Sequence, residues 1–185
     1  MLHPSPVATI ALLGFFAIEL FLRRGAAARS WEPGAMDRGS TRAIVAAYVV
    51  VGVALALPLP GPRLGLRLAW CGAGAAWLGL LLRVVAFRTL GASYSRTLRI
   101  QDEQALVTSG IYRRIRHPGY LSALLVWIGS ALATRSAVAA PLAGGVLLVA
   151  YTYRIHTEER MLREAFGERF AEYQRRSWRL LPFVY

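Results

Sequence analysis

Lysine is missing from this chain of 185 residues, in which all 22 basic residues are arginine. Schiff-base chemistry and general-base catalysis by lysine are therefore excluded. Cysteine is almost as scarce: Cys71 is the only one, which rules out an internal disulfide and argues against a cysteine-based metal site or redox pair. Because Cys71 lies inside an apolar run, we expect it to pack within the protein, and no metal site is predicted.

Charged residues are also few, at 17% of the chain, whereas 56% is hydrophobic. This balance is typical of membrane proteins rather than soluble domains. The net charge of +12 does not indicate a nucleic-acid partner, because the arginines are spread between apolar runs instead of forming one basic domain. The sequence also lacks a dinucleotide fingerprint, since Gly72 and Gly74 lie inside an apolar run without a preceding strand.

Five apolar runs predict an all-α integral membrane protein with five transmembrane helices, forming a single membrane domain over residues 1–185. The spans are expected at about 7–22, 43–57, 68–87, 118–134 and 137–153. Several are shorter than the roughly 20 residues usually needed, but flanking arginines can extend them by snorkelling. Only Arg135 and Ser136 separate the last two spans, which predicts a tight antiparallel hairpin.

The arginines fall unevenly on the two sides of these spans, with 19 on one side and three on the other. By the positive-inside rule, the richer side is cytoplasmic and the N-terminus lies outside. Residues 88–120 and 154–185 then form the cytoplasmic part. Apolar residues recur at helical spacing from 155 to 176, which predicts an amphipathic C-terminal helix on the cytoplasmic side.

Two of the predicted spans contain residues that are unusual for a simple apolar helix: glycines in the third span and a glutamate in the first. Gly72, Gly74 and Gly79 indicate close helix–helix packing, as small residues do in membranes. Glu19 is either a functional acid within the membrane or an interfacial residue that meets Arg23, its i+4 neighbour.

The stretch 106–122 concentrates polar chemistry between two apolar runs. A proline suits the first turn of a helix and disfavours helical dihedrals in the residue before it, so a helix is expected to begin at Pro118. The amides of residues 119–121 would then be free and, beside Arg116, would form an anion site. The alternative is a basic juxtamembrane loop that touches lipid phosphates.

Arg154 and Glu158 are four residues apart where the fifth span ends, so they share one helical face at the membrane boundary. One interpretation is an interfacial salt bridge, worth less than about 1 kcal/mol. The other is a site in which Arg154 holds an acidic group of one ligand while Glu158 meets the cationic part of another. Position alone leaves both open.

Two motifs point to a family. From residue 106 the chain reads Leu-Val-Thr-Ser-Gly-Ile-Tyr, and Arg-His-Pro-Gly-Tyr follows, ending at Tyr120. Further on come Glu158-Glu159-x-x-Leu162 and Phe166-Gly167-x-x-Phe170-x-x-Tyr173. Over roughly residues 90–182, this pattern resembles the isoprenylcysteine carboxyl methyltransferase family and its phospholipid methyltransferase relatives. The resemblance implies a membrane enzyme that uses S-adenosylmethionine without a Rossmann domain.

The resemblance also implies residue roles. The cofactor site would be lined by Gln104, Ala105, Leu106, Val107, Tyr112, His117, Pro118, Gly119, Tyr120 and Glu158. Arg154 and Glu158 would be the catalytic pair, with Arg154 facing the methyl acceptor. That acceptor is expected to be a small lipophilic molecule, isoprenoid- or lipid-like, with a carboxylate or another polar end, which enters from the bilayer among the membrane lipids. The alanine- and arginine-rich composition favours a bacterial inner membrane.

Two other functions remain as alternatives. Sterol- or steroid-type reductases that use NADPH carry a motif that also resembles Arg-His-Pro-x-Tyr. Those enzymes tend to have asparagine before the tyrosine and an acid soon after it, whereas this chain has Gly119 before Tyr120 and then Leu121 and Ser122. A non-enzymatic membrane scaffold would instead bind anionic lipid through its many cytoplasmic arginines.

Overall fold

The computed structural model describes residues 3–21, 37–91 and 106–184. Every regular element in these ranges is a helix, so the prediction of an all-α chain is confirmed there. In chain order the elements are α1 (Pro4–Phe21), α3 (Ser40–Ala56), α4 (Leu66–Leu90), the short 3₁₀ helix η3 (Gly110–Arg113), α5 (Pro118–Ala133), α6 (Ala139–Phe166) and α7 (Glu168–Arg175).

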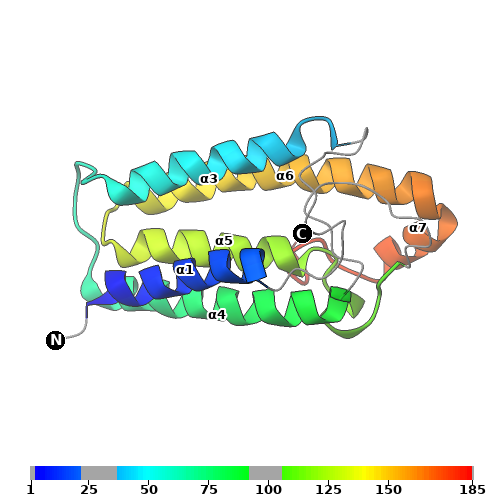
Figure 1. The fold of residues 1–185 in the computed structure, drawn as a ribbon, viewed down its shortest axis with the longest axis horizontal. Coiled ribbons are helices and arrows are strands. Elements are labelled where there is room, and N and C mark those ends of the chain that lie inside the picture. Colours follow the sequence, from blue (N-terminus) through cyan, green and yellow to red (C-terminus); the bar gives the residue numbers. More distant parts are fainter. Residues whose placement is uncertain (1–2, 22–36, 92–105, 185) are drawn as a thin grey trace.

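The long helices form two layers (Figure 1). α3 and α6 lie side by side in one layer, while α1, α4 and α5 make up the other. α5 and α6 contact each other across the layers and are joined only by residues 134–138, which confirms the predicted antiparallel hairpin. α7 lies at one end of the molecule, beyond the start of α5. This arrangement brings the starts of α3 and α5 to the same end as the polar half of α6.

The fifth predicted span and the predicted tail helix need correction. α1, α3, α4 and α5 agree with the first four spans to within a few residues at their ends. α6, in contrast, does not stop at residue 153 but continues to Phe166. Gly167 then ends it, because its φ of 52° lies in the left-handed region that glycine adopts easily. The prediction of one tail helix over 155–176 is therefore wrong.

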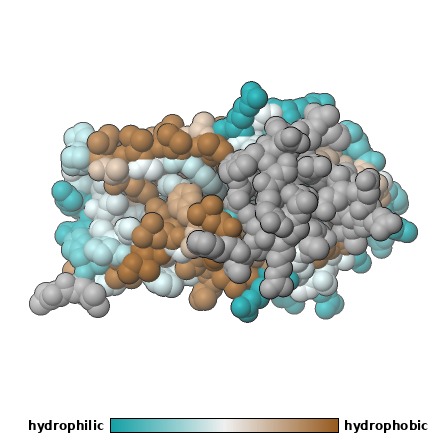
Figure 2. All heavy atoms as spheres, in the orientation of Figure 1, coloured by the Kyte–Doolittle hydropathy of each residue, from teal (hydrophilic) through white to brown (hydrophobic). Residues whose placement is uncertain are grey.

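The outer surface of the bundle is strongly apolar. Among the described residues, α4 alone is long and apolar enough to cross a membrane, and α1, α3 and α5 are shorter apolar helices. Large apolar side chains are nevertheless exposed along several helices, including Leu13 (63%), Leu81 (61%) and Val149 (74%). Figure 2 shows hydrophobic residues over the middle of the helices and hydrophilic residues towards both ends. Such apolar surface indicates contact with lipid rather than water.

Glycines hold α4 and α5 close together. A Cβ atom added to Gly72 would lie 2.5 Å from the Cβ of Leu132, and one added to Gly79 would lie 2.7 Å from the carbonyl oxygen of Ser122. Gly74 has nothing within 4 Å of such an atom. The predicted packing role is therefore confirmed for Gly72 and Gly79 and wrong for Gly74. The predicted packing role of Cys71 is also wrong, because this residue is exposed.

Substituting Gly129 is expected to destabilise the protein. In Gly129→Ala, the new Cβ would lie 2.5 Å from the carbonyl oxygen of Gly72 and 2.7 Å from the backbone nitrogen of Ala76. Because backbone atoms cannot move aside as side chains do, α4 and α5 must separate, at a cost of about 2 kcal/mol or more. Thermal unfolding in detergent measures the effect. The matched control Gly74→Ala should be neutral or stabilising by up to about 1 kcal/mol, and equal losses in both variants would contradict the packing argument.

A partly buried ion pair joins α1 to α4 beside the start of α5. Glu19 pairs with Arg83, whose guanidinium also lies 4.9 Å from the centres of two phenylalanine rings. Arg83 donates a 2.8 Å hydrogen bond to the carbonyl oxygen of Gly119. Glu19 thus has a partner on another helix that its sequence neighbours did not indicate, and Arg23 lies outside the described residues. Arg83 in turn fixes the first turn of α5.

Candidate functional site

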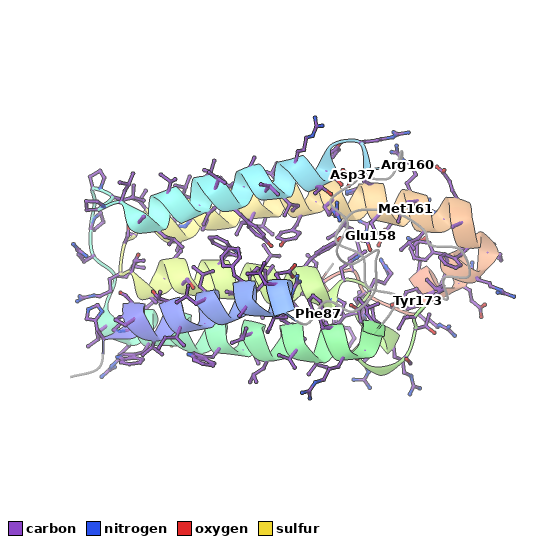
Figure 3. All side chains as sticks on the ribbon, viewed as in Figure 1. Asp37, Phe87, Glu158, Arg160, Met161 and Tyr173 are labelled. Atoms are coloured by element: carbon purple, nitrogen blue, oxygen red, sulfur yellow. The ribbon has the colours of Figure 1, made fainter. Side chains whose placement is uncertain are left out.

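The candidate site lies at the end of the bundle where α5 begins. Asp37, Glu158 and Tyr173 come to this end from distant parts of the chain (Figure 3). The predicted helix start at Pro118 is confirmed. The predicted anion site is wrong in part, because the amides of Tyr120 and Leu121 both donate to the carbonyl oxygen of the preceding cap residue, at 3.1 Å. Two of the three predicted donors are thus engaged within the helix itself.

The C-terminal segment 177–180 lies along the loop that precedes α5. The backbone of residues 178–179 forms three hydrogen bonds of 2.7–3.0 Å with the backbone of residues 114–117. Leu180 is buried and belongs to the main hydrophobic core, which anchors the segment. The backbone of His117 is therefore held on one side by α5 and on the other by the C-terminal segment.

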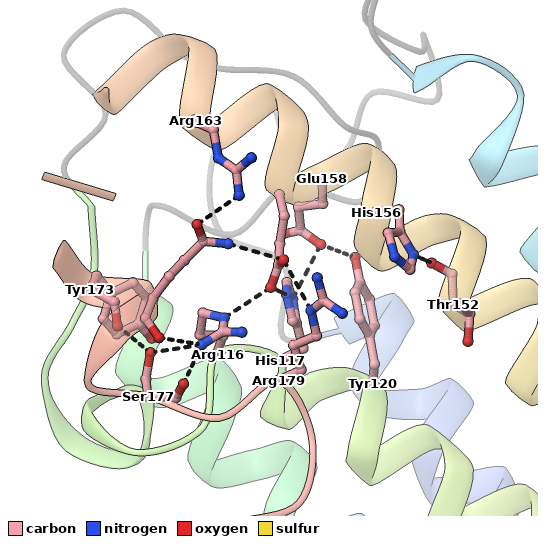
Figure 4. A network of polar contacts seen from close by, with 12 residues as sticks. Arg116, His117, Tyr120, Thr152, His156, Glu158, Arg163, Tyr173, Ser177 and Arg179 are labelled. Carbon is pink, nitrogen blue, oxygen red and sulfur yellow. Dashed lines mark hydrogen bonds and ion pairs between the residues drawn. The ribbon is translucent and has the colours of Figure 1, made fainter. Parts of the chain in front are cut away.

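Arg116, His117 and Arg179 belong to one network of polar contacts (Figure 4). Their shared partner is the buried Glu159. Its Oε1 accepts a 2.9 Å hydrogen bond from Nε of Arg116 and lies 3.2 Å from Nε2 of His117. Its Oε2 accepts from Arg179 and Gln174, both at 3.1 Å. Burial by itself raises the pKa of Glu159, but hydrogen bonds and positive charge from His117 and Arg116 lower it to about 2. Glu159 therefore stays ionised and ties the loop, α7 and the C-terminal segment to α6.

The protein is expected to lose stability as the pH falls from about 5 to about 2. The folded-state pKa of Glu159, about 2, lies below its usual value of 4.5, so its stabilising effect is complete above 4.5 and lost as the pH falls through 2. The shift corresponds to about 3 kcal/mol. Melting temperatures measured in detergent across this range test the expectation. Glu159→Gln should be less stable at pH 7, and the gap to wild type should narrow with acid; a constant gap would contradict it.

Four of the predicted site residues form one connected group. The hydroxyl of Tyr120 donates a 2.5 Å hydrogen bond to Oε2 of Glu158, whose side chain is 24% exposed. His117 places Nδ1 3.6 Å from the same oxygen, and its ring stacks on that of Tyr120 with 5.4 Å between centroids. Nε of Arg154 donates to the Tyr120 hydroxyl at 3.1 Å. The tyrosine hydroxyl thus links the arginine to the glutamate.

Arg154 also has a partner that the sequence analysis missed. Its Nη1 donates to Asp37 at 2.8 Å, to Ser40 at 2.9 Å and to Thr41 at 2.7 Å, all at the start of α3. Asp37 is 1% exposed and Arg154 5%. The sequence signal was weak: an acid followed by Ser and Thr is a common way to begin a helix. Nothing in the spacing connects Asp37 with an arginine 117 residues later.

Of the remaining predicted cofactor residues, those that the structure describes are not members of this connected group. Pro118 is fully buried, and the carbonyl oxygen of Gly119 accepts the hydrogen bond from Arg83. Tyr112 is buried in η3, and its carbonyl oxygen accepts a 2.5 Å hydrogen bond from the hydroxyl of Tyr173. The other four are Leu106 and Val107, half-buried in the irregular segment before η3, and Gln104 and Ala105, outside the described residues.

Known proteins match the part of the chain that builds this site. A model of the phospholipid methyltransferase family matches residues 68–169, which include α5, α6 and the loop with His117. A probable protein-S-isoprenylcysteine O-methyltransferase of Oryza sativa subsp. indica is 36% identical over 113 residues, which cover 58% of this chain and 57% of the relative. Protein-S-isoprenylcysteine O-methyltransferase B of Arabidopsis thaliana is 34% identical over 110 residues, or 58% and 55% of the two chains.

The chain spans a little more than half the length of these curated relatives. Among solved structures, the eukaryotic intramembrane Ras methyltransferase isoprenylcysteine carboxyl methyltransferase has a similar fold, with a TM-score of 0.64 at 22% identity. That likeness covers 95% of this chain and 63% of the other, so it includes the N-terminal helices that the family model leaves out. The chain therefore belongs to the phospholipid methyltransferase family, and its resemblance to isoprenylcysteine carboxyl methyltransferases is confirmed.

Proposed function

We propose that this protein is a methyltransferase that uses S-adenosylmethionine and methylates the carboxylate of a lipophilic, isoprenylcysteine-like acceptor at the membrane surface. The observation that carries the proposal is the connected group of His117, Glu158, Tyr120 and Arg154 at the polar end of an otherwise apolar bundle. It combines an accessible carboxylate, two stacked rings and a buried guanidinium. The names of the curated relatives support the same reaction and acceptor class.

The side chains present fit this cofactor, which carries an ammonium, a carboxylate and a sulfonium. The carboxylate of Glu158 is partly exposed and has acceptor capacity beyond its bond from Tyr120, as an ammonium partner requires. The stacked rings of His117 and Tyr120 offer a π face suited to a cation, worth about 1 kcal/mol. When bound, the cofactor supplies an electrophilic methyl group.

The protein contributes positioning in this mechanism. Arg154 would pair with the carboxylate of the acceptor and orient it for attack on the methyl group that the cofactor supplies. Tyr120 fixes Arg154 and Glu158 relative to each other through one hydroxyl. Orientation of this kind can lower a barrier by several kcal/mol. A carboxylate nucleophile has no proton to lose, so His117 is assigned to binding, held in place by Glu159, rather than to base catalysis.

We further propose that the helices cross the membrane five times, with the N-terminus outside and the site at the cytoplasmic face. The exposed apolar side chains and the 19 to three division of arginines support this topology. An acceptor with an apolar tail would then reach Arg154 sideways from the bilayer. The curated relatives reported above are plant proteins, so they give no support to the predicted bacterial inner membrane.

Ligand titration and a transfer assay test the proposal. Calorimetry on the detergent-purified protein should show micromolar binding of S-adenosylmethionine and of its demethylated product. With labelled cofactor, N-acetyl-S-farnesyl-L-cysteine should gain a base-labile methyl ester. Binding of NADPH without binding of S-adenosylmethionine would favour the reductase alternative. Lipid binding that falls gradually with salt and with the loss of any arginine, without methyl transfer, would favour the scaffold.

A further inference from the structure

The contact between Asp37 and Arg154 raises a question about the acceptor site. In the proposed function, Arg154 pairs with the acidic end of the acceptor, yet in this structure it is already paired with a buried carboxylate at 2.8 Å. Asp37 comes from a part of the chain far from the family motifs and outside residues 68–169. Asp37 and the carboxylate of the proposed acceptor would therefore need the same guanidinium.

We propose that Asp37 determines the specificity of the acceptor site by competing with the carboxylate of the acceptor for Arg154. The inference rests on the proposed function and adds the residue that selects the charge of the acceptor. Without acceptor, Asp37 neutralises the buried arginine. An acidic acceptor replaces Asp37 as the partner of Arg154, whereas an uncharged acceptor has no charge to offer in exchange.

Asp37 can give up Arg154 without becoming a bare buried charge. Its Oδ1 accepts hydrogen bonds from the hydroxyls of Ser40 at 3.0 Å and Thr41 at 2.8 Å, and its Oδ2 accepts from the backbone amide of Thr41 at 3.2 Å. Burial raises the pKa of Asp37, but these bonds, followed by the charge of Arg154, lower it below its usual value. The positive end of α3 adds further stabilisation. The carboxylate is therefore satisfied by its own helix.

Arg154, in contrast, requires a carboxylate in close contact. Its side chain is 5% exposed, and an arginine cannot release its proton to escape the cost of burial. Ser40, Thr41 and Tyr120 offer hydroxyl oxygens but no charge. Asp37 supplies a carboxylate in direct contact with the guanidinium, while Glu158 adds negative charge through the Tyr120 hydroxyl. The carboxylate of the acceptor would take over the contact that Asp37 makes, which makes these two exchangeable.

The exchange also accounts for release of the product. The acceptor oxygen uses an electron pair to bond the methyl carbon, while the carbon–sulfur bond breaks and its electron pair stays on sulfur, so that no proton moves. The product is an uncharged ester. Because an ester cannot neutralise Arg154, Asp37 regains the guanidinium and the ester leaves. The site should consequently bind the acid and its methyl ester with different affinities. Asp37 should determine the ratio of these two affinities.

Binding of a matched pair of compounds tests the inference. Wild-type protein and Asp37→Asn, both saturated with S-adenosylhomocysteine to prevent turnover, are titrated with N-acetyl-S-farnesyl-L-cysteine and with its methyl ester. The side-chain oxygen of asparagine can still accept the hydrogen bond from the backbone amide of Thr41, but asparagine carries no charge. In Asp37→Asn, the ratio of the affinity for the acid to the affinity for the ester should be at least tenfold higher than in wild type. Asp37→Ser, which can also cap α3, should do the same and provides a second variant if the first folds poorly.

Glu168→Gln is the control, since it also neutralises one carboxylate, but an exposed one that pairs with Arg175; its acid-to-ester ratio should stay within twofold of wild type. Normal cofactor binding with an unchanged ratio in both Asp37 variants, or a fall in affinity for the acid, would overturn the competition. Failure of wild type to bind S-adenosylhomocysteine would instead overturn the proposed function, and the inference with it. The two failures are therefore distinct.

Discussion

Glu158→Ala is expected to weaken the binding of S-adenosylmethionine about 100-fold or more, which corresponds to about 2.7 kcal/mol. Glu158 is the carboxylate of the site that is both accessible and next to the stacked rings of His117 and Tyr120. Removing it would leave the ammonium of the cofactor without a partner in a partly buried site, a loss typical of truncated charge pairs. Calorimetry with the demethylated product measures the effect without turnover.

Two control variants accompany this experiment. Glu164→Ala removes a carboxylate from the exposed face of α6, and Arg160→Ala removes a neighbouring exposed charge. Both should bind the cofactor within about twofold of wild type, since exposed charges on a helix contribute little. Wild-type affinity in Glu158→Ala would remove this residue from the cofactor site. A similar loss in all three variants would indicate a general electrostatic effect.

Arg154→Ala should separate acceptor chemistry from cofactor binding. We expect kcat/KM for an isoprenylcysteine acceptor to fall about 1,000-fold, or about 4 kcal/mol, because the acceptor loses the charge that orients it. Cofactor affinity should change by less than about fivefold, since Glu158 remains and Tyr120 still donates to it. The measurements are initial rates with labelled cofactor and, in parallel, calorimetry.

The buried position of Arg154 calls for a check on folding. Asp37 would keep its hydrogen bonds from Ser40 and Thr41, so the start of α3 should persist. A rise in melting temperature on addition of S-adenosylhomocysteine would show that the variant is folded and retains the cofactor site. Equal losses of cofactor affinity and turnover would contradict the assignment of Arg154 to the acceptor.

Several features could be predicted from the sequence because short-range rules set them. Proline geometry placed the start of α5 at Pro118, and two residues between apolar runs required the α5–α6 hairpin. The motifs around His117 and Glu158 indicated the family, which the matches to known proteins confirmed. The apolar runs predicted α1, α3, α4 and α5 to within a few residues at their ends. Each of these inferences depends on residues that are neighbours in sequence or repeat with the period of one helix.

The tertiary structure decided which side chains meet. Sequence spacing treats Gly72, Gly74 and Gly79 alike, but the rotation of α4 against α5 turns only the first and last towards the partner helix. The same holds for charges: Glu19 pairs with Arg83, and Arg154 with Asp37, through contacts between helices far apart in the chain. Coulomb attraction and close packing act over a few ångströms in space, whereas sequence patterns report the exposed and buried faces of one helix. The sequence therefore predicted some of the residues that form the site, but not the contacts between helices that connect them.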